Sequence, residues 1–183
     1  MRPFTRHGAV ITVTLHALEA DMLRDLAGQL AVLLGERAVT HPVDAGSAAA
    51  LLAQLGIGGS TTAPLDPALA RLLPDAYSND DDASSEHRHL TELGLVDRKI
   101  ANANTVVATL IADPVELDGA ASQSWLRALT DLRLTLAARL QIKEDGDFGT
   151  GDTAMLDVYD WIGYLQGMLL EEIESGEVGD DGR

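Results

Sequence analysis

Apolar and polar residues alternate at the start of the chain and then change to a helical period. Between residues 9 and 15, apolar side chains alternate with threonines, which predicts a half-buried strand. The preceding His7-Gly8 pair is a candidate turn toward a short strand over residues 2–6. Because a two-stranded hairpin is only marginally stable, we expect it to lie against helices or to add to another sheet edge.

A helix is predicted from Ala17 to Gly35, where glycine is a natural helix end. Its apolar residues recur every three or four positions, and most charged residues face the other way. The predicted core face consists of Leu15, Leu18, Met22, Leu26, Leu30 and Leu33. A second, short helix is predicted over residues 47–55. The glycine-rich connection over residues 57–62 lacks the Lys-Ser or Lys-Thr pair of a phosphate-binding loop.

Residues 65–82 combine the signals of a short helix with an acidic run. Asp66 is a good N-cap, Pro67 stands at the first helical position, and Pro74 ends the helix. Its apolar face consists of Leu69, Leu72 and Leu73. We expect this face to dock the earlier and later parts of the chain against each other, while Tyr77 leads into the acidic run.

Three longer helices are predicted in the rest of the chain. The first covers residues 84–112 with a bend or break at Gly94, the second covers residues 118–140 after an Asp118 cap, and the third covers residues 153–174. Their predicted core faces are, in chain order, Leu90, Leu93, Val96, Ile100, Ala103, Val107 and Leu110; Trp125, Leu129, Leu132, Leu136 and Leu140; and Leu156, Tyr159, Ile162, Gln166, Leu169 and Ile173.

These elements predict a mainly α protein, with a short N-terminal β-hairpin and helix joined to a C-terminal helical bundle. We interpret residues 1–183 as a single domain. Within it, residues 1–64 form the hairpin and the first helices, and residues 65–82 form the proline-bracketed turn and the acidic linker. Residues 83–175 form the bundle, and residues 176–183 are predicted to be a disordered tail.

Charge is distributed unevenly along the chain, whose net charge is −16. Residues 1–78 carry 5 Lys and Arg against 7 Asp and Glu, whereas residues 79–183 carry 8 against 22. Binding to DNA requires clustered Lys and Arg, and the sequence after Ser78 shows no such cluster. Charge therefore disfavours direct nucleic-acid binding, and an acidic surface can instead steer a basic protein partner.

The chain contains no cysteine, which excludes disulfides, thiol redox switching and thiolate metal sites. No apolar run reaches the length needed to cross a bilayer, and the first seven residues lack the apolar core of a signal peptide. We therefore expect a cytoplasmic protein that does not associate with membranes.

No residues nominate an active site. His87 and His89 lie two apart on a predicted helix and point away from each other, so we do not expect a metal pair. The acidic loop over residues 144–152 lacks the ligand order of a calcium loop, and no serine completes a Gly-x-Ser-x-Gly motif. The sequence predicts no catalytic, cofactor-binding or metal-binding residues and no enzyme activity.

Two helices offer candidate interaction surfaces. The last predicted helix is apolar on a second side around Trp161, and Gly163 and Gly167 lie one turn apart, which allows a close helix approach. This helix is either central in the bundle or the seam of a homodimer. On the preceding helix, Asp131 and Arg133 either belong to an exposed face or tie the helix to a neighbour through a buried polar contact.

Five motifs stand in order along nearly the whole chain. They are Arg2-Pro-Phe-x-Arg6, Asp66-Pro-Ala-Leu-x-Arg-Leu-Leu-Pro-Asp-Ala-Tyr77, Glu86-His-Arg-x-Leu-Thr-Glu92 followed by Lys99, Trp125-Leu-x-x-Leu-x-Asp-Leu-Arg-Leu134 and Tyr159-x-Trp-Ile-Gly-x-Leu-Gln166. In these motifs the chain resembles an actinobacterial family of domains of unknown function that includes the oxidative-stress regulator AosR. The motif residues that we take as interaction candidates are Asp66, Pro67, Arg71, Pro74, Tyr77, Trp125, Asp131, Arg133, Tyr159, Trp161 and Gln166.

The resemblance implies a redox-dependent transcription regulator of oxidative-stress genes that acts with a sigma factor, but it assigns no catalytic or ligand residue. Without cysteine, thiol-based sensing cannot operate within this chain. We therefore predict a non-enzymatic regulator that contacts a protein partner such as a sigma factor or polymerase. The alternative is a helical adaptor or scaffold that does not bind DNA and is linked to Clp proteolysis, because family members are often encoded beside the adaptor ClpS.

Overall fold

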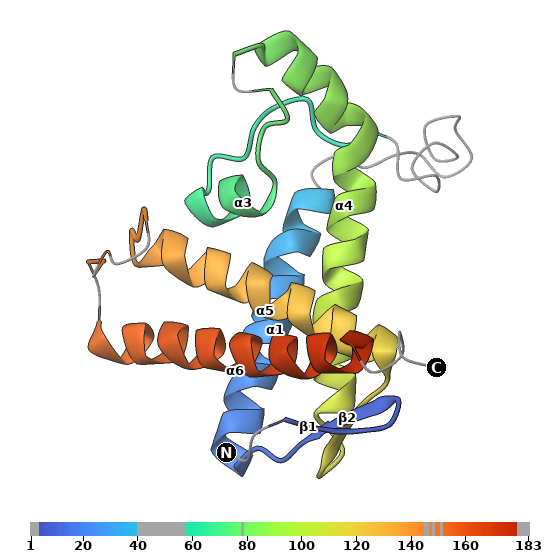
Figure 1. The fold of residues 1–183 in the computed structure, drawn as a ribbon. Coiled ribbons are helices and arrows are strands. Elements are labelled where there is room, and N and C mark those ends of the chain that lie inside the picture. Colours follow the sequence, from blue (N-terminus) through green and yellow to red (C-terminus); the bar gives the residue numbers. More distant parts are fainter. Residues whose placement is uncertain are drawn as a thin grey trace.

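The computed structural model describes residues 4–39, 58–77, 79–144, 147, 149–150 and 152–178. The predicted helix over residues 47–55 and the end of the chain after residue 178 lie outside these ranges. The elements are β1 (Thr5–His7), β2 (Val10–Val13), α1 (Ala17–Val39), α3 (Pro67–Leu72), α4 (Asp81–Thr109), β3 (Val115–Leu117), α5 (Gly119–Arg139) and α6 (Thr153–Val178). The fold is mainly α with a small antiparallel sheet, as the sequence predicts (Figure 1).

The small sheet has the order β1-β2-β3, with both neighbouring pairs antiparallel. The predicted hairpin is confirmed, since Thr5 pairs with Thr12. On the other edge of β2, Thr12 faces Glu116 of β3. The sequence analysis missed β3 because a strand of 3 residues contains too few alternations to show a period. The third strand adds to the hairpin edge, as the marginal stability of two strands requires.

Helix α1 differs from its prediction in both length and orientation. It continues through Gly35 to Val39, so Gly35 is not its end. The predicted face is wrong in part, because Leu15 and Leu30 are buried but Leu18 is 84% exposed. The other buried residues follow a neighbouring stripe of Leu23, Ala27 and Leu34. A helix so rich in Ala, Leu and Val offers two apolar stripes with the same spacing, and packing against α4 selects one of them.

Helix α4 runs without interruption from Asp81 to Thr109, so the bend predicted at Gly94 is not a helix break. Its C-terminal half buries apolar side chains from Val96 onward, as predicted in outline. Its N-terminal half differs, because Leu90 is 49% exposed while Arg88 and Glu92 are buried. A periodicity analysis assigns charged side chains to the solvent and therefore places this face on the wrong side.

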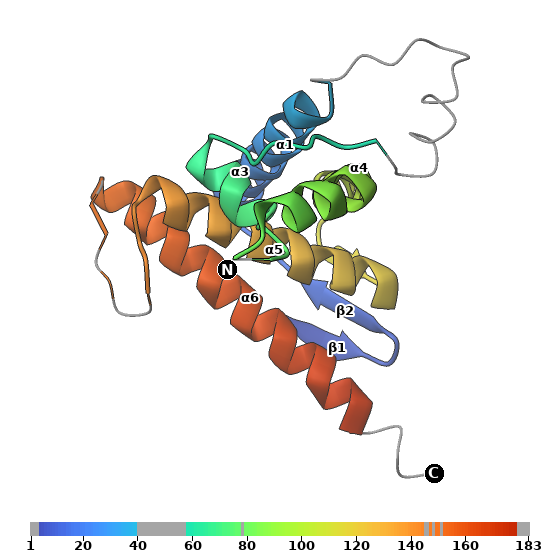
Figure 2. The ribbon, with the colours of Figure 1, turned by 90° about the horizontal axis from the view of Figure 1, so that it is seen from above.

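Helix α5 is the centre of the bundle and contacts α1, α3, α4, α6 and β3. Its predicted core face from Trp125 to Leu140 is buried throughout. Figure 2 shows α5 between α6 on one side and α1 and α4 on the other. The main contacts of α6 are with α5 and β1, so, of the two alternatives left open for this helix, a central place in the bundle is not what the structure shows. Helix α6 also includes residues 176–178, which were predicted to belong to a disordered tail.

The short helix α3 docks on α5, as its apolar face predicts. Leu72 and Leu73 are buried in the main core, and Leu69 packs against that core while partly exposed. Asp66 caps the helix through bonds from the backbone N–H groups of Ala68 (2.8 Å) and Leu69 (3.2 Å). None of the described helices is both long enough and apolar enough to cross a membrane.

Candidate functional site

The central helix α5 presents Asp131 toward α4, where Lys99 lies opposite. The Lys99 Nζ donates to Asp131 Oδ1 at 2.6 Å, and the carboxylate side chain is only 5% exposed. Burial raises the pKa of Asp131 above its ordinary value, and Lys99 opposes that shift by hydrogen bonding and by its charge. The buried polar contact that the sequence left open for Asp131 is therefore present.

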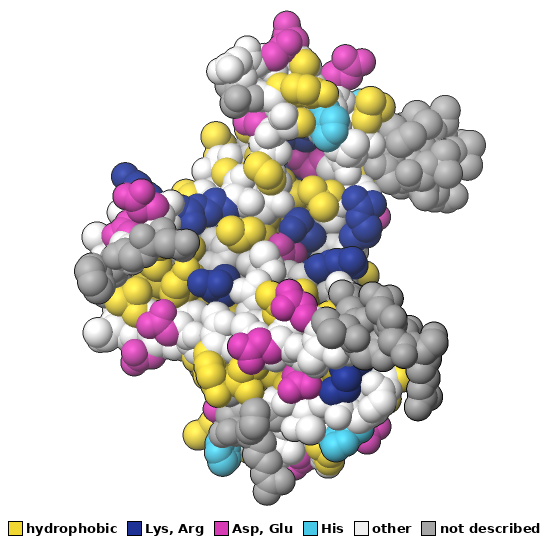
Figure 3. Space-filling view, viewed as in Figure 1, with side chains coloured by type: hydrophobic (Ala, Val, Ile, Leu, Met, Phe, Trp, Pro, Cys, Tyr) yellow, Lys and Arg dark blue, Asp and Glu magenta, His cyan; other side chains and the backbone are white. Residues whose placement is uncertain are grey.

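A basic hollow of about 580 Å³ lies between α4 and α5, next to this ion pair. Its lining includes Arg98 and Lys99 of α4 and Arg127 of α5, with Asn102 and Thr130 as additional hydrogen-bonding groups. Figure 3 shows dark blue Lys and Arg side chains gathered over the middle of this face. The sequence after Ser78 shows no cationic cluster, but the pairing of α4 with α5 brings Arg127 to the adjacent Arg98 and Lys99.

A second hollow of about 250 Å³ adjoins the first, and Thr130 lines both. On this side Arg133 donates to Gln166 Oε1 and to the Tyr159 hydroxyl, both at 3.1 Å, and its guanidinium stacks over the Tyr159 ring. A Cβ on Gly163 would lie 3.2 Å from Arg133 Nε, so the missing side chain makes room for this guanidinium. Arg133 thus ties α5 to α6 through the second of the predicted polar contacts.

The other cations of the second hollow are Arg71 and Lys143. Arg71 of α3 donates to the backbone carbonyl of Ile142, a neutral acceptor, so its charge is not cancelled. Two acids line the hollows: Asp131, which Lys99 neutralises, and the exposed Glu144. Six of the chain's 13 Lys and Arg residues line the two hollows, which form a basic groove along α5 in an otherwise acidic protein. Such a groove can bind anionic groups.

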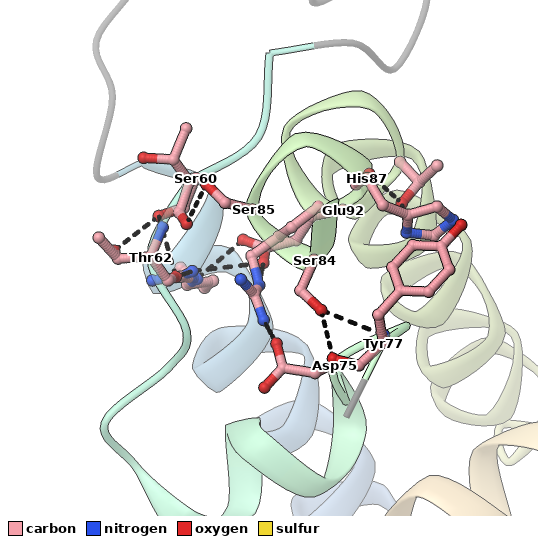
Figure 4. A network of polar contacts seen from close by, with 12 residues as sticks. Ser60, Thr62, Asp75, Tyr77, Ser84, Ser85, His87 and Glu92 are labelled. Carbon is pink, nitrogen blue, oxygen red and sulfur yellow. Dashed lines mark hydrogen bonds and ion pairs between the residues drawn. The ribbon is translucent and has the colours of Figure 1, made fainter. Parts of the chain in front are cut away.

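A second polar centre joins α1, α4 and the segment after α3 (Figure 4). The Arg88 guanidinium pairs with Asp75 and, at 3.3 Å, with Glu92. Glu92 also accepts from Arg37 of α1 at 2.8 Å. Two cations and two carboxylates balance in charge, and their ion pairs hold the three segments together.

The same centre explains several motif residues. Ser84 donates to the carbonyl of Tyr77 at 2.7 Å and accepts from the Tyr77 N–H, which holds the segment after Pro74 against α4. The rings of Tyr77 and His87 meet edge to face (Figure 4). His89 bonds to the Gly59 carbonyl. The two histidines thus have separate partners. No group of three or more metal-ligating residues is found among the described residues.

Several of the remaining candidate residues lie outside the groove, in the core or at a helix end. Trp125 is fully buried, donates to Thr109 Oγ1 at 2.8 Å and meets the Phe4 ring edge-on. Trp161 is partly buried, and its indole N–H has no partner among the residues described. Asp66 accepts from Arg139 at 2.8 Å, next to the exposed Pro67. Of the predicted residues, Arg71, Asp131, Arg133, Tyr159 and Gln166 line the groove.

Sequence reasoning missed Arg98, Asn102 and Thr130 as groove residues. The adjacent cations Arg98 and Lys99 were a weak signal, but only the pairing of α4 with α5 brings Arg127 to them.

The model of a family described as "Domain of unknown function (DUF2017)" matches residues 1–173. The chain belongs to this family. The chain is 34% identical over 172 residues to the "Putative oxidative stress regulator AosR" of Mycobacterium leprae (strain TN), a match that covers 83% of this chain and 77% of the relative. It is 32% identical over 186 residues to the "Oxidative stress regulator AosR" of Mycobacterium tuberculosis (strain ATCC 25618 / H37Rv), covering 91% and 83%. No solved structure matches the chain. The resemblance seen in the motifs is confirmed.

Proposed function

We propose that this protein is a non-enzymatic regulator of the oxidative-stress response that acts in the cytoplasm through protein contacts. The observation that carries this proposal is the match to relatives named oxidative stress regulators, which extends over 83% and 91% of this chain. The family model matches residues 1–173, which include the elements that build the groove along α5 and the polar centre at Arg88. This shared sequence supports a regulatory role for the chain.

The absence of cysteine restricts how a stress signal reaches this chain. Thiol oxidation, disulfide formation and thiolate metal release all require a cysteine sulfur. In our proposal the oxidant is detected by another protein, and this chain responds to that protein or to its altered surface.

The charge distribution supports a protein partner. A net charge of −16 repels a DNA polyanion at long range, and the cations of the groove cover only one face. Complementary charges on a protein partner would speed encounter and set orientation. A sigma factor or RNA polymerase subunit is the partner class that we propose.

The contacts of the charged groups support a non-enzymatic role. Lys99 and Asp131 are bound to each other, and Arg88 is bound to Asp75 and Glu92. Within the described residues, hydroxyl groups near the groove serve structural bonds; Thr130, for example, donates to the Leu126 carbonyl and accepts from Gln166. None of these contacts positions a nucleophile beside a base.

Affinity capture combined with DNA-binding measurements tests the proposal. The tagged chain is expressed in a mycobacterium, and captured proteins are identified before and after peroxide treatment. In parallel, the purified chain is assayed for DNA binding by gel shift at two salt concentrations.

Specific recovery of a sigma factor or polymerase supports the proposal. Recovery of Clp components alone would favour the helical adaptor instead. Tight, salt-sensitive DNA binding by the isolated chain would overturn a mechanism based on protein contacts.

A further inference from the structure

The basic groove extends along α5 over both hollows and has cations at each end. Arg98, Lys99 and Arg127 line one end, and Arg71, Arg133 and Lys143 line the other. We propose that this groove binds an extended acidic segment of the partner protein. The inference rests on the proposed function and specifies the partner's chemistry.

The length of the groove matches a peptide better than a single small anion. The α5 residues that line it extend from Arg127 to Ala137, and a helix of that length rises about 15 Å. An extended chain advances about 3.3 Å per residue, so about five residues would span both ends. A phosphate or sulfate ion would contact the cations of one hollow only.

The cations at the α4 end are available to a ligand. Within the described residues, Arg98 and Arg127 form no ion pair, and both side chains are exposed. Because Asp131 is occupied by Lys99, it does not cancel the two guanidinium charges. Planar guanidinium groups can bind carboxylates in a bidentate manner, which favours Asp and Glu side chains as ligands.

The lining between the cations favours a peptide over nucleic acid. Apolar side chains alternate with the charged ones along both hollows: Leu95, Ala101, Leu134, Ala137 and Ile142. These can contact the methylene groups of a peptide. The aromatic ring of the lining, Tyr159, has one face covered by the Arg133 guanidinium and packs against the apolar core, which leaves little of the ring for base stacking.

Fluorescence anisotropy with a labelled oligoglutamate peptide of about eight residues tests this inference on the full chain. The matched oligoglutamine peptide serves as the uncharged probe. The double variant Arg98→Gln/Arg127→Gln removes the unpaired cations of one end. The control variant Arg24→Gln removes a charge from α1, where Arg24 contacts Asp21 and the Leu110 carbonyl and lines neither hollow.

We expect the double variant to bind oligoglutamate about tenfold more weakly at an ionic strength of ~0.15 M, and Arg24→Gln to change affinity by less than about twofold. The oligoglutamine peptide should not bind. Equal losses in the groove and control variants would overturn the inference, as would failure of the wild type to bind oligoglutamate. Tighter binding of duplex DNA than of oligoglutamate at equal salt would assign the groove to nucleic acid instead.

The captured partner separates this inference from the proposed function. Displacement of a captured sigma factor or polymerase by oligoglutamate supports both. If the double variant captures the partner as well as the wild type does, the regulator proposal stands and the groove inference fails. If no protein partner is captured, the proposed function fails.

Discussion

Lys99 of α4 and Asp131 of α5 form an ion pair of 2.6 Å across the helix interface that forms the floor of the groove. The pair links α4 to α5 beside the hollow, and it keeps the Asp131 charge from opposing the groove cations.

Replacing Lys99 by methionine should leave Asp131 as a buried carboxylate without its cation. We expect Lys99→Met to lower the free energy of unfolding by about 3 kcal/mol, because an uncompensated buried charge is strongly unfavourable. The neighbouring Arg98→Met variant is the control, since Arg98 is exposed, and it should change stability by less than about 0.5 kcal/mol. Urea unfolding measures both. Similar losses of unfolding free energy in the two variants would show that the Lys99–Asp131 ion pair contributes no more to stability than an exposed cation does.

The raised pKa of Asp131 predicts a pH-dependent stability with a definite sign. Because the folded-state pKa lies above the ordinary value of 3.8, the native state holds more protons than the unfolded state between the two values. The free energy of unfolding contributed by Asp131 therefore falls as the pH rises through this window. Asp131→Asn does not titrate here, so the stability of wild type relative to this variant should decrease as the pH rises above 3.8. Urea titrations over an acidic pH series measure the difference, and a wild type that gains relative stability with rising pH would contradict the prediction.

The Arg88 network predicts that its members differ in importance according to their burial. Arg88→Met should destabilise the protein by about 2 kcal/mol or more, since Glu92 loses one of its two cations in a buried position. Asp75→Asn should cost less than about 1 kcal/mol, because the Asp75 side chain is 49% exposed. Thermal and chemical unfolding measure the order of the two effects. A larger loss of stability in Asp75→Asn than in Arg88→Met would contradict this prediction, because the exposed ion pair would then contribute more than the buried one.

Two glycines with different surroundings should respond oppositely to alanine. Gly35 lies inside α1 and a Cβ there would meet nothing within 4 Å, so Gly35→Ala should stabilise the protein by about 0.5–1 kcal/mol. A Cβ on Gly59 would lie 2.9 Å from the Glu92 Cβ and 3.1 Å from the Arg88 carbonyl oxygen. Gly59→Ala should therefore destabilise by about 1–3 kcal/mol. Melting temperatures of the pair check this, and a loss of stability in Gly35→Ala would restore Gly35 as a helix end.

The Asp66 cap predicts a stability contribution that disappears in acid. Burial alone would raise the pKa of Asp66, but the hydrogen bond from Arg139 and those from two backbone N–H groups outweigh it and hold the pKa below its ordinary value. Asp66→Ala should cost about 1 kcal/mol at neutral pH, which is typical of a lost N-cap. Because the folded-state pKa is depressed, the ionised cap stabilises the fold above the ordinary value, and this contribution is lost as the pH falls through the folded-state pKa. Unfolding measured at neutral and acidic pH tests this, and a difference that persists unchanged in acid would point to lost packing instead.

The sequence predicted an element correctly where residues close together in the chain determine its structure. Asp66 and Pro67 predict the start of α3 because the cap bonds connect neighbours in sequence. The stripe from Trp125 to Leu140 predicts the buried face of α5 because only one side of that helix is apolar. The hairpin of β1 and β2 was predicted because its two strands and the turn between them are neighbours in sequence.

Contacts between distant segments determined which faces of α1 and α4 are buried, and these faces were predicted incompletely or wrongly from the sequence. The apolar residues of α1 fit two stripes, and contact with α4 chose the one that contains Leu23. Arg88 and Glu92 are buried because Arg37 and Asp75 arrive from distant segments to neutralise them. Burying the charged side chains of Arg88 and Glu92 would be strongly unfavourable without those partners. The sequence of α4 alone therefore gives no reason to expect these two residues in the interior.

Residue identity, spacing and composition were enough to predict a mainly α fold, the family and the absence of thiol chemistry. The central place of α5, and the hollow that Arg98, Lys99 and Arg127 share, depend instead on how the helices pair. A charge count contains no information about where the charges lie in space. A strongly acidic chain still forms a basic groove when helix pairing places its few cations on the same face.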